Sequence, residues 1–417
     1  MDPLVMKSLN AIELLKLIRQ HRRISRSTLA TLSRLSKPTV SDQVDSLLAR
    51  GLVVEVGTGD ASARGGKRPT LLEFNADFGR VLCVDVGSES VRFASADLMG
   101  AILCRLEFPA RPEQGAKSVL RTVKRGISDL LSSDSTERKL RLISVAVPGI
   151  VDVDRGVVLE TDNVFGWRNL DVAGFLNDAF GIAAHVDNDV NMAAVAELHA
   201  GGDHRADDFV LVRLNTGIGA GVVLGGALHH GAHWAAGEVG HMALNTKAAA
   251  GPASPRGYLE SVVGADCVNQ RIRKAARGSD SGVTSTVRRH GGWAALEKAA
   301  RHPGGPLAEV IDDLTLHLAC AVANIAAVYD PESVILHGEP FPFLLERIQS
   351  LTRKLIPWPI EIRLSELGAD ACLQGALAAG LAQAYGQIAS SLDAEGWSEH
   401  GRDHSHRRTI AVAGSDH

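Results

Sequence analysis

The stretch VDVGSESVRF, residues 84–93, decides the fold that we expect for most of this chain. An apolar run that begins near residue 80 ends in Asp85 and Gly87, which indicates a buried strand entering a tight turn. Such a turn can hold the phosphates of a nucleotide, because backbone N–H groups approach a ligand closely at glycine. Glu89, two residues further on, carries a charge that repels phosphate. The sequence therefore raises the question whether this loop binds phosphate or is the remnant of one that did.

The composition is that of a soluble protein with two or three domains. The chain has 417 residues, 45% of them hydrophobic and 22% charged, and this length exceeds one ordinary core. Its five cysteines lack C-x-x-C spacing, which favours buried thiols in a reduced compartment. The N-terminus has no signal pattern, and the apolar run at residues 314–329 is short for a membrane span. We therefore expect a cytoplasmic protein without a membrane segment.

The charge is distributed unevenly between a basic head and an acidic body. Residues 1–70 contain 12 Lys and Arg against 6 Asp and Glu, a net charge of +6. Because the whole chain carries −4, the remainder carries −10. A small basic head of this kind indicates contact with a polyanion.

Residues 1–78 have the pattern of a winged helix-turn-helix domain. Apolar positions three and four apart predict an amphipathic helix over 8–22, and Ser25 or Ser27 is a candidate N-cap for a short second helix. The third helix is expected to begin at Ser36, with a buried stripe behind it, and to end at Gly51. The apolar segments on either side of TGDASARGGKRP predict a hairpin with a basic tip, which is the wing.

Seven polar or basic residues of this head are candidates for contact with double-stranded DNA. The third helix offers side chains near its N-terminus to base edges, and the wing offers cations among glycines. These residues are Lys37, Thr39, Ser41, Gln43, Arg64, Lys67 and Arg68. The alternative is a small helical module that binds protein and carries a solvated basic loop.

The rest of the chain predicts an α/β body of two similar lobes around a cleft. Short strands alternate with helices, and glycines stand at strand ends, where the sites of such folds lie. We assign residues 79–190 to the first lobe, completed by a C-terminal helix over 371–388, and residues 191–370 to the second lobe. The polar, histidine-rich tail, residues 389–417, is expected to be disordered.

Four motifs in a fixed order resemble the ROK family, whose name joins repressors, open reading frames and sugar kinases. They are VAVPGIVD (145–152), VDNDVNMAAVAE (186–197), LNTGIGAGVVLGG (214–226) and AAGEVGH (235–241). SRLSKPTVSDQVDSLLARGLV and GGKRPTLLEFN resemble the winged helix of its repressor branch. The resemblance covers about residues 8–388. It implies an actin-like, ribonuclease H-like body that binds a sugar between its lobes, in a homodimer or homotetramer.

The same resemblance implies a set of sugar ligands in the cleft. Hydroxyl groups are recognised by carboxylates, amides and imidazoles rather than by an apolar pocket. The matching positions are Asn163, Asn188, Asp189, Glu238, His241 and Glu260. In the family's kinases the residue that matches Asp189 takes the proton from the attacking hydroxyl, so Asp189 is catalytic only if this chain is a kinase.

The zinc site that is usual in the family is not expected here. The family binds zinc through the histidine that matches His241 and three cysteines, and those cysteine positions hold Gly251, Ala253 and Tyr258. None of these residues is a thiolate, so we expect no metal and no resident cofactor. ATP and Mg²⁺ enter only if the chain is a kinase.

The nucleotide elements are only partly preserved. The family's kinases have D-x-G-G-T in the first phosphate loop, whereas this chain keeps Asp85 and Gly87 but continues with Ser88 and Glu89. The second loop keeps Thr216, Gly217 and Gly219, and the nucleoside-side turn reads His337-Gly338 instead of Gly-Gly. We therefore interpret the first loop as a remnant.

This pattern favours a sugar-responsive transcription regulator, most simply a repressor, that keeps the sensor and has lost the kinase. Two alternatives remain open: an active ATP-dependent sugar kinase with a DNA-binding head, and a regulator controlled by a protein partner.

Overall fold

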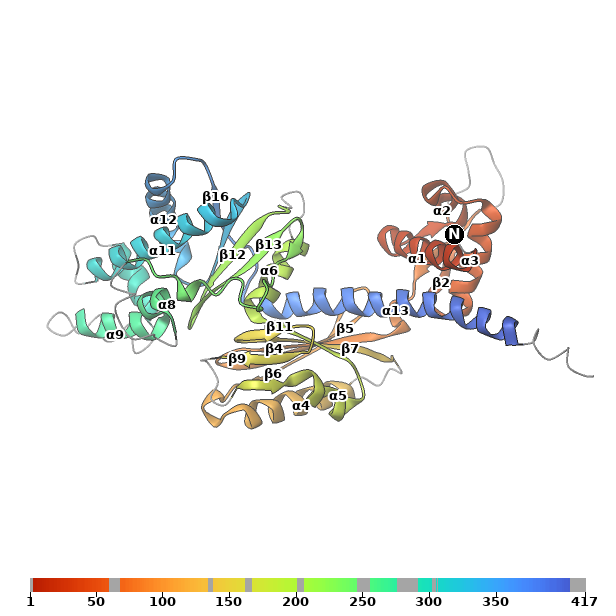
Figure 1. Ribbon diagram of the computed structural model, residues 1–417, viewed down its shortest axis with the longest axis horizontal. Coiled ribbons are helices and arrows are strands. Elements are labelled where there is room, and N and C mark those ends of the chain that lie inside the picture. The colour runs from red at the N-terminus through yellow and green to blue at the C-terminus, as the bar shows by residue number, and fades with distance from the viewer. Residues whose placement is uncertain are drawn as a thin grey trace, which may run out of the picture.

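The computed structural model describes residues 3–59, 68–133, 138–161, 167–200, 206–245, 256–275, 292–301, 305 and 307–405. Figure 1 shows a winged-helix head beside a body of two lobes, with one long helix running under the head and between the lobes.

The head is the predicted winged helix. Its elements are α1 (Pro3–His21), β1 (Ile24–Ser25), α2 (Arg26–Ser33), α3 (Lys37–Ala49), β2 (Val53–Thr58) and β3 (Thr70–Phe74), followed by the short helix η1 (Ala76–Phe78). The predicted N-caps are confirmed, because Ser25 Oγ accepts from Thr28 N at 3.1 Å and Ser36 Oγ accepts from Thr39 N at 3.2 Å. Gly51, at φ 72°, follows α3 and turns the chain into the hairpin, which pairs antiparallel.

The first lobe is a five-stranded sheet between helices. Its strands lie in the order β11-β7-β4-β5-β6, and the fully buried β4 is at the centre. The bounds are β4 (Arg80–Val86), β5 (Ser90–Asp97), β6 (Ile102–Pro109), η2 (Pro112–Gln114), α4 (Ala116–Ser133), β7 (Leu140–Val147), α5 (Val172–Phe180) and β11 (Ala184–Asn188). A small sheet of β8 (Ile150–Asp152), β9 (Val157–Glu160) and β10 (Arg168–Asp171) lies beside it.

The second lobe repeats the strand connectivity of the first. Its sheet has the order β14-β13-β12-β15-β16, with β12, β15 and β16 parallel and β13 and β14 antiparallel, as β4, β7, β11 and β5, β6 are in the first. The strands are β12 (Phe209–Leu214), β13 (Ile218–Leu224), β14 (Ala227–Leu228), β15 (Ser333–His337) and β16 (Glu361–Leu364). The helices are α6 (Asp189–Ala200), η4 (Val239–His241), α8 (Tyr258–Val263), α9 (Ala265–Ala275), α11 (Ala308–Tyr329) and α12 (Phe341–Leu355). This duplication is the predicted two-lobed architecture.

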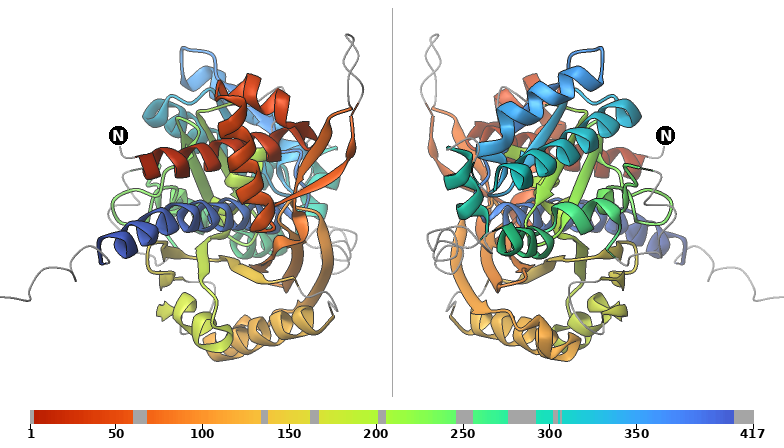
Figure 2. Two further views of the ribbon diagram at one scale, coloured as in Figure 1. Left: turned by 90° about the vertical axis from the view of Figure 1, so that its right-hand side faces the viewer. Right: turned by 90° about the vertical axis from the view of Figure 1, so that its left-hand side faces the viewer.

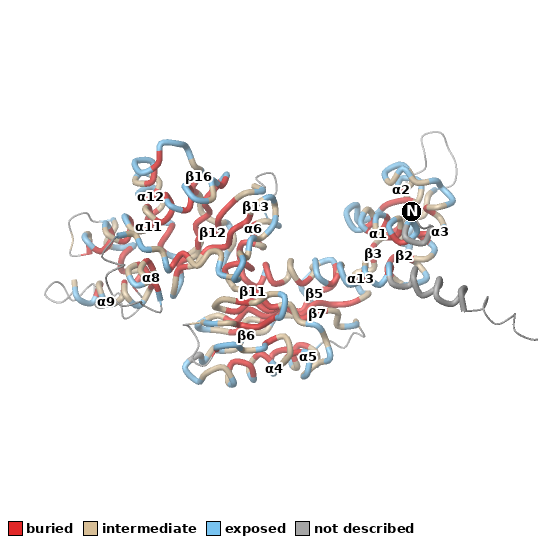
Figure 3. The backbone as a smooth tube through the Cα atoms, in the orientation of Figure 1, coloured by how far each residue is buried: buried red, intermediate tan, exposed pale blue. Residues whose placement is uncertain are grey.

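Helix α13 (Ala371–Ser405) joins all three parts of the molecule. It packs on α6, on strands β4 and β7 of the first lobe, and on α1 of the head. Figure 2 shows it passing between the lobes, and Figure 3 shows buried positions along its inner side. Ala384, Ile388 and Leu392 belong to one apolar cluster with the core of the head.

The C-terminal segment corrects one expectation from the sequence. The helix was expected to end at residue 388 and a disordered tail to begin at 389, but α13 continues to Ser405. The physical reason is that Leu392 extends the apolar stripe of Ala384 and Ile388 and is 5% exposed against the head. Residues 406–417 lie outside the described residues.

Helix α11 has the length and hydropathy of a membrane-spanning helix, but 61% of its most apolar window is buried inside the protein. Within the described residues no other helix meets these criteria. Because α11 packs on α8, α9 and α12, it is the central helix of the second lobe.

Candidate functional site

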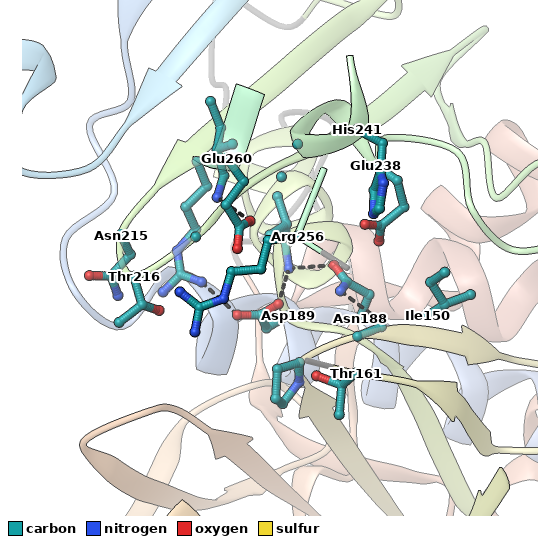
Figure 4. Close-up of a pocket in the computed structure, with 18 of the residues that line it drawn as sticks. Ile150, Thr161, Asn188, Asp189, Asn215, Thr216, Glu238, His241, Arg256 and Glu260 are labelled. Carbon is teal, nitrogen blue, oxygen red and sulfur yellow. Dashed lines mark hydrogen bonds and ion pairs between the residues drawn. The ribbon is translucent and has the colours of Figure 1, made fainter. Parts of the chain in front are cut away.

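A cavity of about 610 Å³ opens between the two lobes, at the carboxyl ends of their strands. This volume lies within the range of small-molecule sites. Of the residues singled out in the sequence, Asn188, Asp189, Thr216, Gly217, Gly219, Glu238, His241 and Glu260 line it. Figure 4 shows side chains from both lobes pointing into the same space.

The base of the cavity is formed where β11 ends and α6 begins. Asn188 caps α6, because its Oδ1 accepts from Val190 N at 2.8 Å and from Asn191 N at 3.1 Å, while its amide donates to Gly149 O at 2.9 Å. These bonds fix the Asn188 side chain, and they place Asp189 in the first turn of α6, where the helix dipole favours a carboxylate.

Asp189 is paired with an arginine that the sequence reasoning missed. Arg213 of β12 donates from Nη1 to Asp189 Oδ2 at 2.6 Å, and both side chains are mostly buried, at 14% and 18% exposure. The signal in the sequence was a single cation inside the otherwise apolar strand FVLVRL. Arg213 therefore already donates a charge-assisted hydrogen bond to one carboxylate oxygen of Asp189.

The opposite wall carries acidic and imidazole groups. Glu238 and His241 come from the short η4 segment, and Glu260 comes from α8 (Figure 4). Glu260 Oε2 accepts from Ile218 N at 3.1 Å, which ties α8 to β13. A Cβ at Gly217 would stand 2.6 Å from this carboxylate oxygen, so the glycine permits the approach. Acceptors arranged on two walls match the needs of a ligand rich in hydroxyl groups.

The glycine motif at residues 215–221 also serves the packing of β13 on α6. A Cβ at Gly219 would stand 3.2 Å from Val190, and one at Gly221 would stand 2.5 Å from the Cβ of Ala194. Strand β13 therefore lies against α6 only because these positions are small. These glycines are therefore needed for packing, in addition to the phosphate-binding role that the motif predicts.

The first phosphate loop lies outside the cavity lining. Asp85 is 2% exposed and forms an ion pair with Arg92 of β5, at 2.5 Å between Oδ2 and Nη2. Burial raises the pKa of Asp85 to about 6, against the lowering effect of Arg92. Gly87 N donates to Ser90 O at 2.9 Å, and Glu89 is exposed at the tip of the turn. The Gly87 N–H and the Asp85 carboxylate are thus already engaged within the protein.

The remaining nucleotide element is also crowded. Burial, and then the nearby Arg213, lowers the pKa of His337, whose Nε2 lies 3.3 Å from Gly368 O. Gly338 has φ 139°, and a Cβ there would stand 2.0 Å from Leu214 O. Arg92 additionally donates to Asp370 Oδ1 at 3.1 Å and to Ala369 O at 2.6 Å, at the start of α13. Asp85 and Asp370 are therefore both paired with Arg92.

The donor set does not fit a structural zinc ion. The hydroxyl of Tyr258, at one of the family's cysteine positions, lies 3.1 Å from His317 Nε2. Gly251 and Ala253 lie outside the described residues. Across the described ranges, no group of three or more His, Cys, Asp or Glu side chains is arranged to hold a metal.

The candidate DNA contacts divide into four groups. Lys37 and Arg68 are exposed, and Thr39 and Ser41 are partly buried, with Ser41 Oγ accepting from Arg26 Nη1 at 3.1 Å. Gln43 is a correction, because it is 5% exposed and lies on the inner face of α3 with Val40, Val44 and Leu47. Its spacing of three from Val40 and four from Leu47 places it in that buried stripe. Arg64 and Lys67 lie outside the described residues, as does Asn163 among the sugar positions.

A second arginine stands among the cavity residues that the sequence analysis did not single out. Arg256 lines the cavity just before Gly257 and donates to Asp266 at 3.0 Å, outside the pocket. In Figure 4 its side chain crosses the space in front of Asp189. Its position next to the GYLE motif was the only signal in the sequence.

Comparisons with known proteins agree with this architecture. The ROK family profile matches residues 81–383, and the MarR family profile matches residues 7–54. The putative xylose repressor of Caldicellulosiruptor sp. (strain Rt8B.4) is 26% identical over 389 residues, which covers 90% of this chain and 96% of the relative.

Two solved structures illustrate the similarity in fold. A ROK family transcriptional regulator, described as a homolog of E. coli MLC protein, aligns with a TM-score of 0.75 at 25% identity, over 94% of this chain and all of the other. A ROK family glucokinase from Streptomyces griseus, in complex with glucose and AMPPNP, aligns with a TM-score of 0.61 at 20% identity, over 72% of this chain and 99% of the other. The glucokinase likeness shows the fold of the body alone, whereas the regulator also covers the head. Because the family profile spans most of its length, from the first strand of the body to the middle of α13, this chain belongs to the ROK family.

Proposed function

We propose that this protein is a sugar-responsive transcription regulator, acting as a repressor, whose cleft binds a sugar without phosphorylating it. The head binds operator DNA through α3 and the wing, and the cleft residues Asn188, Asp189, Glu238, His241 and Glu260 receive the hydroxyl groups. A homodimer presents two heads to a pseudo-palindromic operator.

The observation that carries this proposal is the pairing of both kinase carboxylates with arginines. Phosphoryl transfer needs a base that is free to accept the hydroxyl proton and a carboxylate that helps to hold the metal. Asp189 is paired with Arg213, and the buried Asp85 is paired with Arg92. The sugar side of the cleft keeps its acceptors. A carboxylate paired in this way still accepts a hydrogen bond from a hydroxyl, so binding persists where catalysis does not.

The repressor assignment rests on the joining of head and body in one chain. The winged helix places the exposed Lys37 at the first turn of α3, where cations and helix N–H groups meet phosphate. The similar proteins that span both parts are named as a xylose repressor and a transcriptional regulator. A pentose or a hexose is therefore the first effector class to examine.

Calorimetry without nucleotide tests the binding half of the proposal. We would titrate the full chain with xylose, glucose, N-acetylglucosamine and the 6-phosphates of the two hexoses. One sugar is expected to bind, and Glu238→Gln or His241→Ala should weaken it at least tenfold, because a charge-assisted hydrogen bond contributes about 1.5–3 kcal/mol. Glu346→Gln and His199→Ala make the same chemical changes at exposed positions on α12 and α6, and they should leave the affinity unchanged.

A second candidate function, an active sugar kinase, is favoured by the intact loop Thr216–Gly219 at the cavity wall. An ATP-consumption assay with the same sugars separates the two. Sugar-dependent turnover that Asp189→Asn abolishes would establish the kinase and contradict the proposal. If calorimetry detects no sugar binding, the remaining alternative is a regulator that is controlled by a protein partner.

A further inference from the structure

Tyr258, the first residue of α8, links one wall of the cavity to α11. Its hydroxyl oxygen accepts from Asn245 Nδ2 at 2.5 Å and lies 3.1 Å from Nε2 of His317 on α11. The rings of Tyr258 and His317 also pack at a tilt, with their centroids 6.0 Å apart. Asn245 and Tyr258 stand on either side of residues 246–255, which lie outside the described residues. One hydroxyl group therefore joins three points of the chain.

His317 is held from its other side as well. Its Nδ1 lies 2.8 Å from the backbone oxygen of Asp313, one turn earlier on α11, and Asp313 Oδ2 accepts from Arg271 Nη2 of α9 at 2.7 Å. A carbonyl oxygen only accepts, so His317 donates from Nδ1, and the neutral form of its ring accepts at Nε2. The Tyr258 hydroxyl then donates to His317 and accepts from Asn245. This chain of hydrogen bonds runs from α9 through α11 to α8, and each donor in it has an acceptor.

The start of α8 is packed tightly against the η4 segment, which supplies Glu238 and His241. Gly257 has φ 71°, and a Cβ there would stand 2.5 Å from Gly240 O and from His241 Cα. A Cβ at Gly240 would in turn stand 3.3 Å from the Cβ of Glu260. The carboxylates of Glu238 and Glu260 and the imidazole of His241 therefore belong to one closely packed unit, which is the acidic wall of the cavity.

The link acts on this wall from behind. Tyr258 and His317, both within the described ranges, lie outside the cavity lining, whereas Glu260, two residues after Tyr258, lies inside it. The side chain of His317 is only 17% exposed, so water competes little for its Nε2. Helix α8 packs on α11, the central helix of the second lobe. The Tyr258 hydroxyl therefore affects the cavity through the position of α8 and not by contact with a ligand.

The same segment is the one that the family's zinc ion would fasten. A zinc ion in that position would join His241 to the segment that ends at Tyr258, and it would need thiolates to do so. Tyr258 stands at one of the three cysteine positions, and its hydroxyl is already engaged by an amide and an imidazole. The donor set does not fit zinc, but it joins the same part of the chain to α11 by hydrogen bonds.

We propose that the Tyr258–His317 hydrogen bond takes the place of the structural zinc ion, and that Tyr258 is a positioning residue for the sugar. The bond holds the acidic wall in its binding geometry before the sugar arrives, so less conformational entropy is lost on binding. Sugar affinity is accordingly independent of zinc. This inference rests on the sugar-binding function proposed for the cleft, which it deepens by naming what holds the wall.

Hydrogen exchange of the full chain tests the link without any sugar. Tyr258→Phe keeps the ring and removes the hydroxyl, so the amides of α8 should exchange several times faster than in the native protein. Tyr329→Phe makes the same chemical change at the end of α11, outside the cavity lining, and it should leave the exchange of α8 unchanged. Equal exchange of α8 in the native protein and in Tyr258→Phe would overturn the proposal.

Calorimetry with xylose, glucose and N-acetylglucosamine tests the effect on the cleft. Tyr258→Phe should weaken the binding of the sugar that the native protein binds by about three- to tenfold, which corresponds to the loss of an ordinary hydrogen bond. His317→Leu removes the same bond from its other side, so the double variant should lose less binding free energy than the two single variants together. Fully additive losses would show that the two residues act separately, and they would overturn the proposal.

Metal analysis provides the third readout. The purified chain should contain no stoichiometric zinc, and dialysis against EDTA should change neither the sugar affinity nor the exchange of α8. One zinc ion per chain, whose removal by EDTA makes α8 exchange faster, would overturn the proposal. If the native protein binds none of the sugars, the function proposed for the cleft fails, whereas the exchange measurement still decides whether Tyr258 holds α8.

Discussion

Asp189 is the residue on which the choice between the proposed sugar sensor and a sugar kinase depends. It stands in the first turn of α6, with one carboxylate oxygen 2.6 Å from Arg213 and the other 3.0 Å from Val190 N. The pair holds the carboxylate in the geometry of an acceptor. The same pair occupies one of the two carboxylate oxygens that a catalytic base would offer to the attacking hydroxyl.

Removal of one partner of the Asp189–Arg213 ion pair should lower the free energy of unfolding more than removal of both partners. Asp189→Asn leaves Arg213 buried without a counter-ion, so we expect it to destabilise the protein by about 3 kcal/mol. The double variant Asp189→Asn with Arg213→Met should recover more than half of that loss. Thermal unfolding of the two variants and the native protein measures this. A double variant less stable than Asp189→Asn alone would contradict the uncompensated-charge interpretation.

A second residue-scale prediction concerns pH. His230 Nε2 lies 2.8 Å from Asp187 Oδ2, and this hydrogen bond raises the pKa of His230 above its ordinary value, against the effect of burial. A raised pKa means that the folded protein binds the proton more tightly. The stabilisation is therefore complete below the unfolded pKa of about 6.5 and is lost as pH rises through the folded value.

The variant His230→Gln checks this sign. The melting temperature of the native protein should exceed that of the variant most at pH 6, and the difference should shrink by pH 8.5. His199→Gln, at an exposed position of α6, is the matched control and should show no such trend. A difference that grows with pH would show that His230 is neutral in the folded state.

At the scale of elements, α13 is the part of the structure that the sequence predicted least completely. Ala384, Ile388 and Leu392 repeat at intervals of four, which is a helical stripe that the polar, histidine-rich composition after residue 389 concealed. Their partner is the core of the head, which comes from the other end of the chain. A single sequence shows the stripe but not what covers it.

Elements with local signals were predicted well. Ser25 and Ser36 mark the starts of α2 and α3 because their side chains accept from N–H groups three residues on. Buried strands such as β4 were visible as continuous apolar runs. Gln43 was assigned wrongly to the DNA-facing side because the polar residue type was given more weight than its spacing from Val40 and Leu47.

The acidic, amide and imidazole residues of the candidate site could be predicted from the sequence, but the ion pairs around it could not. Glu238, His241 and Glu260 were found from motifs, and the structure brings them to one cavity with Asn188 and Asp189. The Arg213 and Arg92 pairs come from strands whose side-chain neighbours depend on the sheet register and on the approach of α6. These contacts depend on tertiary structure, so no local sequence pattern predicts them.

The docking of α13 on the head gives the element-scale prediction. Leu392→Ala removes a side chain that is 5% exposed and should destabilise the head–body contact by about 2–4 kcal/mol. Asp393→Ala, its exposed neighbour on the same helix, should have little effect. Limited proteolysis at the head–body junction measures the change. Equal protection of Leu392→Ala and Asp393→Ala would show that α13 does not hold the head.

At the scale of the whole molecule, the cleft and the head are connected through two helices. Helix α6 begins at the cavity between the lobes and packs along α13, and α13 continues to α1 and the core of the head. The closest point is Gly375, where a Cβ would stand 1.6 Å from Met192 O. Tyr385 adds a second connection, since it packs edge-on against Phe74 of the head and donates to Leu98 O of the body. We therefore expect that a movement of α6 on sugar binding would displace α13 and the head with it.

A substitution at the α6–α13 contact should weaken this coupling. Gly375→Ala forces the two helices apart, so we expect sugar and DNA each to bind while the effect of sugar on DNA affinity falls at least threefold. Gly386→Ala lies on the same helix with open space around it and should stabilise by about 1 kcal/mol without changing the coupling. Anisotropy titrations with and without sugar measure both variants. If sugar changes the DNA affinity of Gly375→Ala as much as that of the native protein, the α6–α13 contact does not transmit the effect.

The most direct test of the central claim is fluorescence anisotropy of the full chain on DNA from its own upstream region. The titration is repeated at fixed salt with each sugar and no ATP. We predict that one sugar shifts the DNA dissociation constant at least tenfold, and that Glu238→Gln abolishes the shift while leaving DNA affinity unchanged. A sugar that calorimetry shows to bind in the cleft, but that leaves the DNA titration where it was, would contradict the account.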